Sequence, residues 1–363
     1  MTGKLFRLLM CGACLSALAT LPALRANNGQ GQLAAERCQT AAQDLLAALT
    51  PEIEPSVSLP FDDKRKVWSY FPNIPELVQR EEGAPLEELT QDQRMAAHRL
   101  MECGLSSQGY QKVNAIMRLG DLETRGPAAG RPIGSTFFWL AVFGDPSSGE
   151  PWGWQLEGHH LALNFTVVDG KLSFTPMFLG ADPARVPSGP YAGWRVLGNE
   201  VDKAFALLNA LTPAQQKQTI LADEMPERFF TQPGRADALK TYAGLPGSEL
   251  TDDQRQLLWS FIEEYVLNIE DDLARQHLQT IRSDGLDDVY FSWMGPTTPG
   301  SGIYYRIHGS SILIEFTHAR NRGSGAADPN HVHTVFRYPG NDFGQDLLRI
   351  HYETSPDHQD EGH

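Results

Sequence analysis

Short apolar segments with strand character constrain the fold most, because they come in neighbouring groups and do not alternate regularly with helices. They span residues 136–143, 161–168, 172–177, 289–293, 304–307, 312–316 and 333–336. Grouped strands favour antiparallel pairing, whereas regular alternation with helices would indicate a parallel sheet. Asp169 and Gly170 separate two of these segments and are typical of a tight hairpin turn. The sequence therefore predicts an α+β fold, a mostly antiparallel sheet with flanking helices.

Helix starts repeat one pattern, a threonine followed three residues later by a glutamine. It occurs at Thr90–Gln93, Thr212–Gln215 and Thr251–Gln254. In such a capping box the threonine side chain accepts from the third backbone amide, and the glutamine side chain reaches back to the threonine amide. Two further helices are predicted, one from about Leu33 to Leu49 and one following Ser106. No internal repeat is evident beyond this helix-start pattern.

The N-terminus resembles a bacterial secretory leader. A short basic start precedes an apolar run from Leu8 to Leu21, which is too short to span a bilayer. The residues permit cleavage after Ala19 or after Ala26. We predict a signal peptide over residues 1–26 and a single α+β domain over 27–363. The mature chain is expected in the periplasm or outside the cell, with no stable membrane insertion after leader removal.

Charge and motifs exclude several classes of partner. The chain carries a net charge of -15, and the leader contains only basic charged residues, so the mature protein is more acidic still. An acidic protein repels phosphate backbones, and we therefore expect no nucleic-acid partner. Neither a GxGxxG fingerprint nor a Walker loop is present, which removes the usual support for hydride or phosphoryl transfer through a nucleotide cofactor.

Two cysteines, Cys38 and Cys103, remain once Cys11 and Cys14 leave with the leader. Both fall in helical contexts. In an oxidising compartment they are expected to form one disulfide that joins two helices. The alternative is a pair of buried thiols, and the spacing suggests neither a metal site nor a nucleophile.

A His-X-His pair, His331 and His333, is the first candidate for metal chemistry. Alternate side chains of a strand share one face, so these two imidazoles can chelate one ion together. Imidazole suits zinc, copper, iron or nickel, and an exported site favours zinc or copper. Two ligands from one strand also reduce the entropy lost when a site is assembled. We predict a transition metal ion, zinc or copper, at this pair.

A second histidine block, Glu157-Gly158-His159-His160, gives the remaining candidate ligands. On a regular strand His159 and His160 point to opposite faces, and the polar face selects His160. A bulge or turn at Gly158 would instead bring both imidazoles to one side. Glu157 is a candidate ligand, partner of a histidine, or general base for metal-bound water. His159 is equally consistent with a hydrogen-bonded histidine of the core.

Other polar residues lie in strand segments that otherwise consist of core residues. Glu315 is a candidate catalytic acid or base, with a salt-bridge role as the alternative, because a buried carboxylate needs a partner. Substrate or supporting contacts are predicted for Arg306, His308, Asn330, Arg337 and Asp342. Arg306 and His308 share one strand face with Tyr304, and this face is expected to supply either that partner of Glu315 or an anion-binding edge. We expect Arg337 to pair with Asp342 and to orient the loop between them.

Several of these segments together resemble a known bacterial family, domain of unknown function 3500. The resemblance covers nearly the whole mature chain and rests on Trp152-Gly153-Trp154, Glu157 to Leu161, Asn164-Phe165-Thr166, Tyr304-Tyr305-Arg306, Asn330 to His333 and Asp342 to Leu348. A longer Gly/Ala stretch at 320–328 departs from the family pattern. The resemblance implies no particular activity, but it marks the two histidine blocks.

From the residue chemistry we predict an exported metal-dependent enzyme, with a hydrolase as the first choice. His159 or His160 would combine with His331 and His333 to hold the ion, and Glu157 or Glu315 would act as acid or base. Hydrolysis is favoured because no organic cofactor site is visible. The alternatives are a copper-dependent oxidoreductase and a non-catalytic exported metal- or ligand-binding protein. The substrate, a small molecule or a peptide, is not identified.

Overall fold

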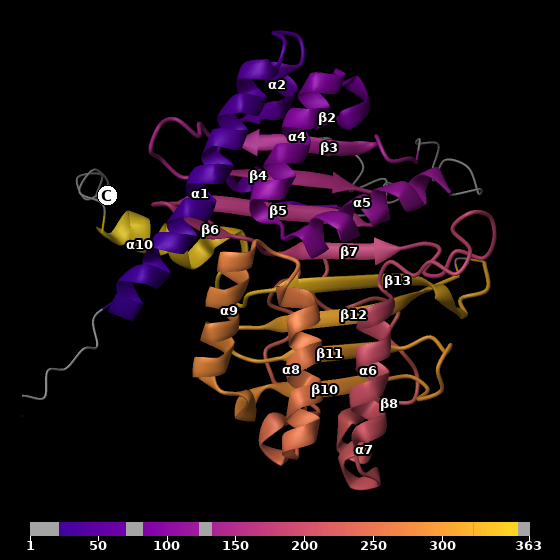
Figure 1. Ribbon diagram of the computed structural model, residues 1–363. Helices are drawn as coiled ribbons and strands as arrows, with labels where there is room; N and C mark the ends of the chain where they lie inside the picture. The colour runs from indigo at the N-terminus through magenta and orange to yellow at the C-terminus, as the bar shows by residue number, and fades with distance from the viewer. Residues whose placement is uncertain (1–21, 70–82, 123–132, 322, 355–363) are drawn as a thin grey trace, which may run out of the picture.

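A computed structural model describes residues 22–69, 83–122, 133–321 and 323–354. Most of the predicted leader, residues 1–21, lies outside the described residues, so the leader stays a prediction. One large sheet runs through the molecule, and the long helices cover one of its faces (Figure 1). The α+β class with a mostly antiparallel sheet is confirmed. None of the helices in the described ranges is long and apolar enough to cross a membrane.

The sheet has the strand order β1-β3-β4-β5-β7-β13-β12-β11-β10-β8, with β2, β6 and β9 attached beside this path. Only β1 with β3 and β8 with β10 pair in parallel among the described strands. The strands are β1 (Ser58–Leu59), β2 (Ala84–Pro85), β3 (Phe138–Phe143), β4 (Trp152–Gly158), β5 (Leu161–Val168), β6 (Lys171–Ser173), β7 (Met177–Ala181), β8 (Ile220–Ala222), β9 (Leu245–Pro246), β10 (Tyr290–Met294), β11 (Tyr304–His308), β12 (Leu313–Arg320) and β13 (Ala327–Arg337).

The predicted capping boxes are confirmed at Thr90, Thr212 and Thr251, where both reciprocal hydrogen bonds are present. They start three of the helices, which are α1 (Pro22–Ala48), α2 (Glu54–Val57), α4 (Gln91–Gly104), α5 (Ser107–Asp121), α6 (Gly198–Ala210), α7 (Pro213–Thr219), α8 (Asp252–Val266), α9 (Asp271–Asp284) and α10 (Gln345–Thr354). Short 3-10 turns are η1 (Asp63–Lys66), η2 (Leu86–Glu88), η3 (Gly247–Glu249), η4 (Leu286–Asp288) and η5 (Asp342–Gly344).

The chain contains an internal repeat, contrary to the expectation from sequence. Each repeat has a helix, a short helix, a parallel edge strand, a short strand, a helix pair and a meander of four strands. The first repeat runs from α1 to β7 and the second from α6 to β13. They meet where β7 pairs antiparallel with β13, at the middle of the sheet (Figure 1).

Matching local interactions support the equivalence of the repeats. Residues 83–94 and 244–255 share Gly, Pro, Glu, Leu, Thr, Asp, Gln and Arg at the same spacing. In each repeat the capping-box glutamine also donates to the last carbonyl of the first helix, Gln93 to Ala48 and Gln254 to Ala210. The first residue of each block, Gly83 or Gly244, has a φ of 101°. A Cβ there would collide with the backbone of the neighbouring strand, so only glycine fits.

The two faces of the sheet differ in what covers them. One face packs on the helices and forms the main apolar core. The other face is covered by two irregular segments, 60–69 and 223–243, which we call the cover segments. Their aromatic residues Trp68 and Phe229 both pack on Phe178 of β7. The sheet face beneath the cover segments holds many buried polar side chains, among them Asn164, Glu315 and Arg337.

A disulfide joins Cys38 of α1 to Cys103 of α4, as one of the two sequence interpretations predicted. Both residues belong to the apolar core on the helical face of the sheet. The bridge connects two helices of the first repeat and no strand.

Acidification from pH 6.5 to pH 4 is expected to destabilise the fold through His277. This imidazole is buried against Phe174, Phe336 and Tyr338, and burial lowers its pKa to about 4. In this window the unfolded chain binds a proton that the folded chain excludes, so the free energy of unfolding falls as the pH falls. The full shift corresponds to about 3 kcal/mol.

Urea unfolding at several pH values measures this effect, with His277→Phe as the matched variant. The variant should lose less stability than wild type between pH 6.5 and pH 4. A residual loss is expected in both proteins, because burial also lowers the pKa values of His308 and His318 to about 4. Identical pH slopes in the two proteins would contradict the assignment to His277.

Candidate metal centre

His331 and His333 lie on β13 and point to the sheet face beneath the cover segments. Strand alternation places them on one face, together with Val335. His333 lies opposite Gly180 of β7, and its ring contacts Phe178 of the same strand at a centroid distance of 5.6 Å. The His-X-His pair therefore sits on the strand where the two repeats meet.

His160 reaches the same place from a turn, which was one of the two sequence interpretations, and not from the face of a regular strand. Gly158 of β4 pairs with Leu161 of β5, so His159 and His160 form the two-residue connection of a hairpin. His160 has a φ of 68°, in the left-handed region that non-glycine residues rarely adopt. This backbone conformation places the His160 side chain next to His333. The regular alternation of a strand would not do so.

Gly180 of β7 has no side chain and so leaves space for the His160 imidazole beside β7. Its amide donates to the His160 carbonyl, so the turn is fixed beside β7. A Cβ at position 180 would lie 2.8 Å from Cδ2 and 3.1 Å from Cβ of His160. Any side chain larger than hydrogen would therefore push the imidazole away from β13. Sequence reasoning did not identify this glycine.

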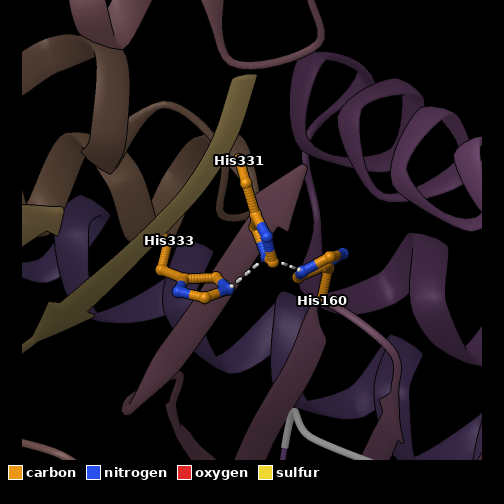
Figure 2. Close-up of side chains that lie close together, drawn as sticks. All are labelled: His160, His331 and His333. Atoms are coloured by element: carbon orange, nitrogen blue, oxygen red, sulfur yellow. Dashed lines mark hydrogen bonds between the residues drawn. The ribbon is translucent and has the colours of Figure 1, made fainter. Parts of the chain in front are cut away.

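The three imidazoles converge through their Nε2 atoms, with His331 between the other two (Figure 2). The Nε2 atom of His331 lies 2.8 Å from that of His160 and 3.0 Å from that of His333. A tetrahedral zinc ion with nitrogen ligands at about 2.0–2.1 Å separates those nitrogens by about 3.3 Å. The ligand nitrogens of all three histidines lie within 4.8 Å of one another, which is close enough for one metal ion to be held by the group.

A carboxylate stands behind the central histidine. Asp182 follows β7 directly, and its Oδ2 lies 3.2 Å from Nδ1 of His331. A carboxylate at this nitrogen favours the tautomer in which Nδ1 carries the proton and Nε2 is free to bind a metal. Asp182 was missed from the sequence, because nothing local indicates that the residue after β7 faces a histidine of β13.

Burial keeps the centre largely shielded from water. His160 and His333 are 3% and 4% exposed, whereas His331 is partly exposed. Burial, with a smaller contribution from His331, holds the pKa of His333 well below its usual value. A neutral imidazole is the form that binds metals. His331 is the histidine of the group that is partly exposed to solvent.

Glu157 lies on β4 and faces the same side of the sheet as the histidines. It pairs with Ala162 of β5, which pairs in turn with Phe178 beside His333. Its Oε1 is buried from solvent. His159, the other residue of the histidine block, stacks on His160 at 3.9 Å but is outside the converging group.

Glu315 is placed differently, because its carboxylate holds a cover segment. Its Oε1 accepts from the Phe230 amide and the Tyr304 hydroxyl at 2.7 and 2.8 Å, and its Oε2 accepts from the amide and hydroxyl of Thr231. It lies opposite Val335 and not opposite a histidine. The structure therefore gives Glu315 a positioning role for residues 230–231.

Arg337 fixes the same segment from the next strand. Its guanidinium donates to the hydroxyl and the carbonyl of Thr231 and forms an ion pair with Asp342. The predicted Arg337–Asp342 contact is thus present. Asn330, near the start of β13, accepts from the amides of Ala184 and Arg185 and holds the chain that follows Asp182. These contacts support the centre without touching the imidazoles.

Arg306 and His308 lie on β11 and are separated from β13 by β12. Both are buried on the same sheet face as the histidines. Across two strands the separation from β13 is about 10 Å, so the structure does not bring them to the metal centre.

Comparison with known proteins places the chain in a family. The family model described as a protein of unknown function (DUF3500) matches residues 32–345. The chain belongs to the DUF3500 family. The match contains the three histidines and Asp182 and agrees with the resemblance found in the sequence. No curated protein and no solved structure matches the chain. The description of the DUF3500 family states no activity.

Proposed function

We propose that the protein is an exported metal-dependent hydrolase that binds a zinc or copper ion through His160, His331 and His333. The convergence of the three Nε2 atoms carries this proposal. Three protein ligands leave a fourth position of a tetrahedral ion open, which is typical of catalytic sites. A metal ion bound there would supply an activated water molecule.

The surrounding residues support the same interpretation. Asp182 orients His331 from behind, as carboxylates do for metal-binding histidines. Glu157 lies on the same sheet face, and we assign it the role of general base. Glu315 is less suited to this role, because its carboxylate accepts hydrogen bonds from residues 230 and 231 of the cover segment. The disulfide is compatible with the proposed export to an oxidising compartment.

Metal content after removal of single histidines tests the centre. Wild type purified without chelators should contain about one zinc or copper ion per chain, measured by elemental analysis. His160→Ala, His331→Ala and His333→Ala should each lose the stoichiometric metal, since two imidazoles hold an ion far less tightly than three. Asp182→Asn should lower the metal affinity about 10- to 100-fold.

His159→Ala is the matched control, because His159 is adjacent to His160 but outside the converging group. It should retain the metal. Wild type without metal after exposure to zinc and copper would overturn the proposed centre. Equal loss in His159→Ala and His160→Ala would overturn the ligand assignment, provided that thermal melting shows both variants to be folded.

Glu157→Gln separates a hydrolase from a metal-binding protein without catalysis. With a panel of ester and amide substrates, the variant should keep its metal but lower kcat by about 100-fold, because the amide cannot accept a proton from water. Turnover unchanged in Glu157→Gln would remove Glu157 from the mechanism. Loaded wild type that turns over no ester or amide, with the metal in place, would favour the binding protein.

A further inference from the structure

Arg306 is a buried guanidinium that forms no ion pair with any residue the structure describes. Its side chain is 3% exposed on β11, and no acidic group of the described residues lies within ion-pair distance of it. Its Nε has neither solvent contact nor a hydrogen-bond partner. A buried charge is costly unless an opposite charge and hydrogen bonds compensate it. The environment of Arg306 therefore calls for an anion.

Glu315, directly opposite on β12, does not fill that role. Its two oxygens accept from Phe230, Thr231 and Tyr304. The Tyr304 hydroxyl lies between the two charged groups: burial and Glu315 raise its pKa, and Arg306 opposes this. Tyr304 thus links Arg306 to Glu315 through one hydroxyl, and the Nε of the guanidinium has no hydrogen-bond partner among the described residues.

Two more buried polar atoms without hydrogen-bond partners lie on the same face. Ser292 of β10 pairs with Arg306 across the strands, is fully buried, and has an unpartnered Oγ. His308, two residues further along β11, has an unpartnered Nδ1 and is 6% exposed. A hydroxyl, an imidazole and a guanidinium nitrogen therefore gather where strand alternation puts all three side chains on one side.

The aromatic ring of Tyr242, from a cover segment, forms a wall of this cluster. It stacks on Tyr290 of β10 at 5.3 Å and meets the ring of His308 edge-on at 4.6 Å. Tyr242 itself is 47% exposed. Tyr242 is thus the solvent-exposed residue that contacts His308.

We propose that Arg306, Ser292 and His308 bind the carboxylate group of a small organic acid at a site separate from the metal centre. The guanidinium supplies one positive charge and the hydroxyl a further donor. Burial and Arg306 lower the pKa of His308 to about 4, so this imidazole is neutral at pH 7 and donates a hydrogen bond without adding charge. One positive charge matches a carboxylate and leaves a phosphate dianion undercompensated.

Thermal melting with sodium acetate tests the site, with sodium chloride at equal ionic strength as the reference salt. Acetate is expected to raise the Tm of wild type by about 2 °C or more at saturation, because a ligand of the folded state stabilises it. His331→Ala, which lacks a metal ligand, should show the same rise. Arg306→Met should show none, and Ser292→Ala should need a higher acetate concentration for the same rise.

Several other outcomes would overturn the proposal. If acetate leaves wild type unchanged, or raises the Tm of Arg306→Met equally, Arg306 does not bind carboxylates. A larger rise with inorganic phosphate than with acetate would overturn the carboxylate assignment. Loss of the acetate effect in folded His331→Ala would show that the anion binds at the metal centre. Ser292→Ala decides the question if Arg306→Met fails to fold, and an unchanged acetate response in that variant would overturn the site.

Discussion

Replacing Lys112 by methionine is expected to lower the free energy of unfolding by about 3–5 kcal/mol. The Lys112 ammonium lies 2.6 Å from Glu200 and 3.1 Å from Glu264, and all three side chains are buried between α5, α6 and α8. Burial raises the pKa of Glu200, and Lys112 opposes this rise. Without the lysine, a fully buried carboxylate would stay charged without a partner or take up a proton on folding.

Urea unfolding at pH 7 measures this loss, and two variants sharpen it. Lys203→Met should cost less, because Lys203 is more exposed than Lys112 and forms an ion pair with one carboxylate, that of Glu264 at 2.9 Å, where Lys112 pairs with two. Adding Glu200→Gln to Lys112→Met should recover part of the stability, since an amide carries no charge that needs compensation. If Lys112→Met were as stable as wild type, the ion cluster would not hold the helices together.

Removing the disulfide is expected to cost about 4 kcal/mol. Cys38 and Cys103 are separated by 65 positions, and a cross-link that closes a loop of this length reduces the entropy of the unfolded chain by about that amount. The folded state should change little, because both side chains stay within the apolar core between α1 and α4.

The double variant Cys38→Ala, Cys103→Ala should therefore keep the far-UV circular dichroism spectrum of wild type while unfolding at lower urea concentration. Treating wild type with a reductant in urea should move its transition towards that of the variant, whereas the variant itself should not respond. A transition of wild type that is insensitive to the reductant would contradict a stabilising bridge.

Local patterns in the sequence predicted the parts of the fold that depend on local interactions. The threonine–glutamine pairs became capping boxes because both hydrogen bonds form within one helical turn. Asp169 and Gly170 form the predicted hairpin turn, with φ values of 50° and 68° that suit these residue types. The antiparallel arrangement followed from the grouping of the strands.

Features that depend on distant segments were missed. Strand β4 was not predicted, because Gln155 and Glu157 interrupt the apolar pattern, and only the cover segments explain why such residues are buried or half-buried there. The repeat was missed because similarity between its halves is concentrated in residues 83–94 and 244–255.

The candidate centre divides in the same way. Strand periodicity was sufficient to predict that His331 and His333 share a face, because alternation is a property of one strand. His160 required a turn with positive φ, and Asp182 required the pairing of β7 with β13. The turn at Gly158 was one of two local interpretations, whereas the pairing of β7 with β13 joins segments that are far apart in the sequence. Gly180 escaped notice for the same reason, since its role becomes visible only when His160 lies over it.

The internal repeat links ligand binding at the three histidines to the docking of the two halves of the chain. His160 belongs to the first repeat, whereas His331 and His333 belong to the second, and the repeats meet along β7 and β13. A site of this kind exists only in the docked arrangement of the two halves. Any ion bound by all three imidazoles would therefore cross-link the two repeats, because its binding free energy opposes their separation.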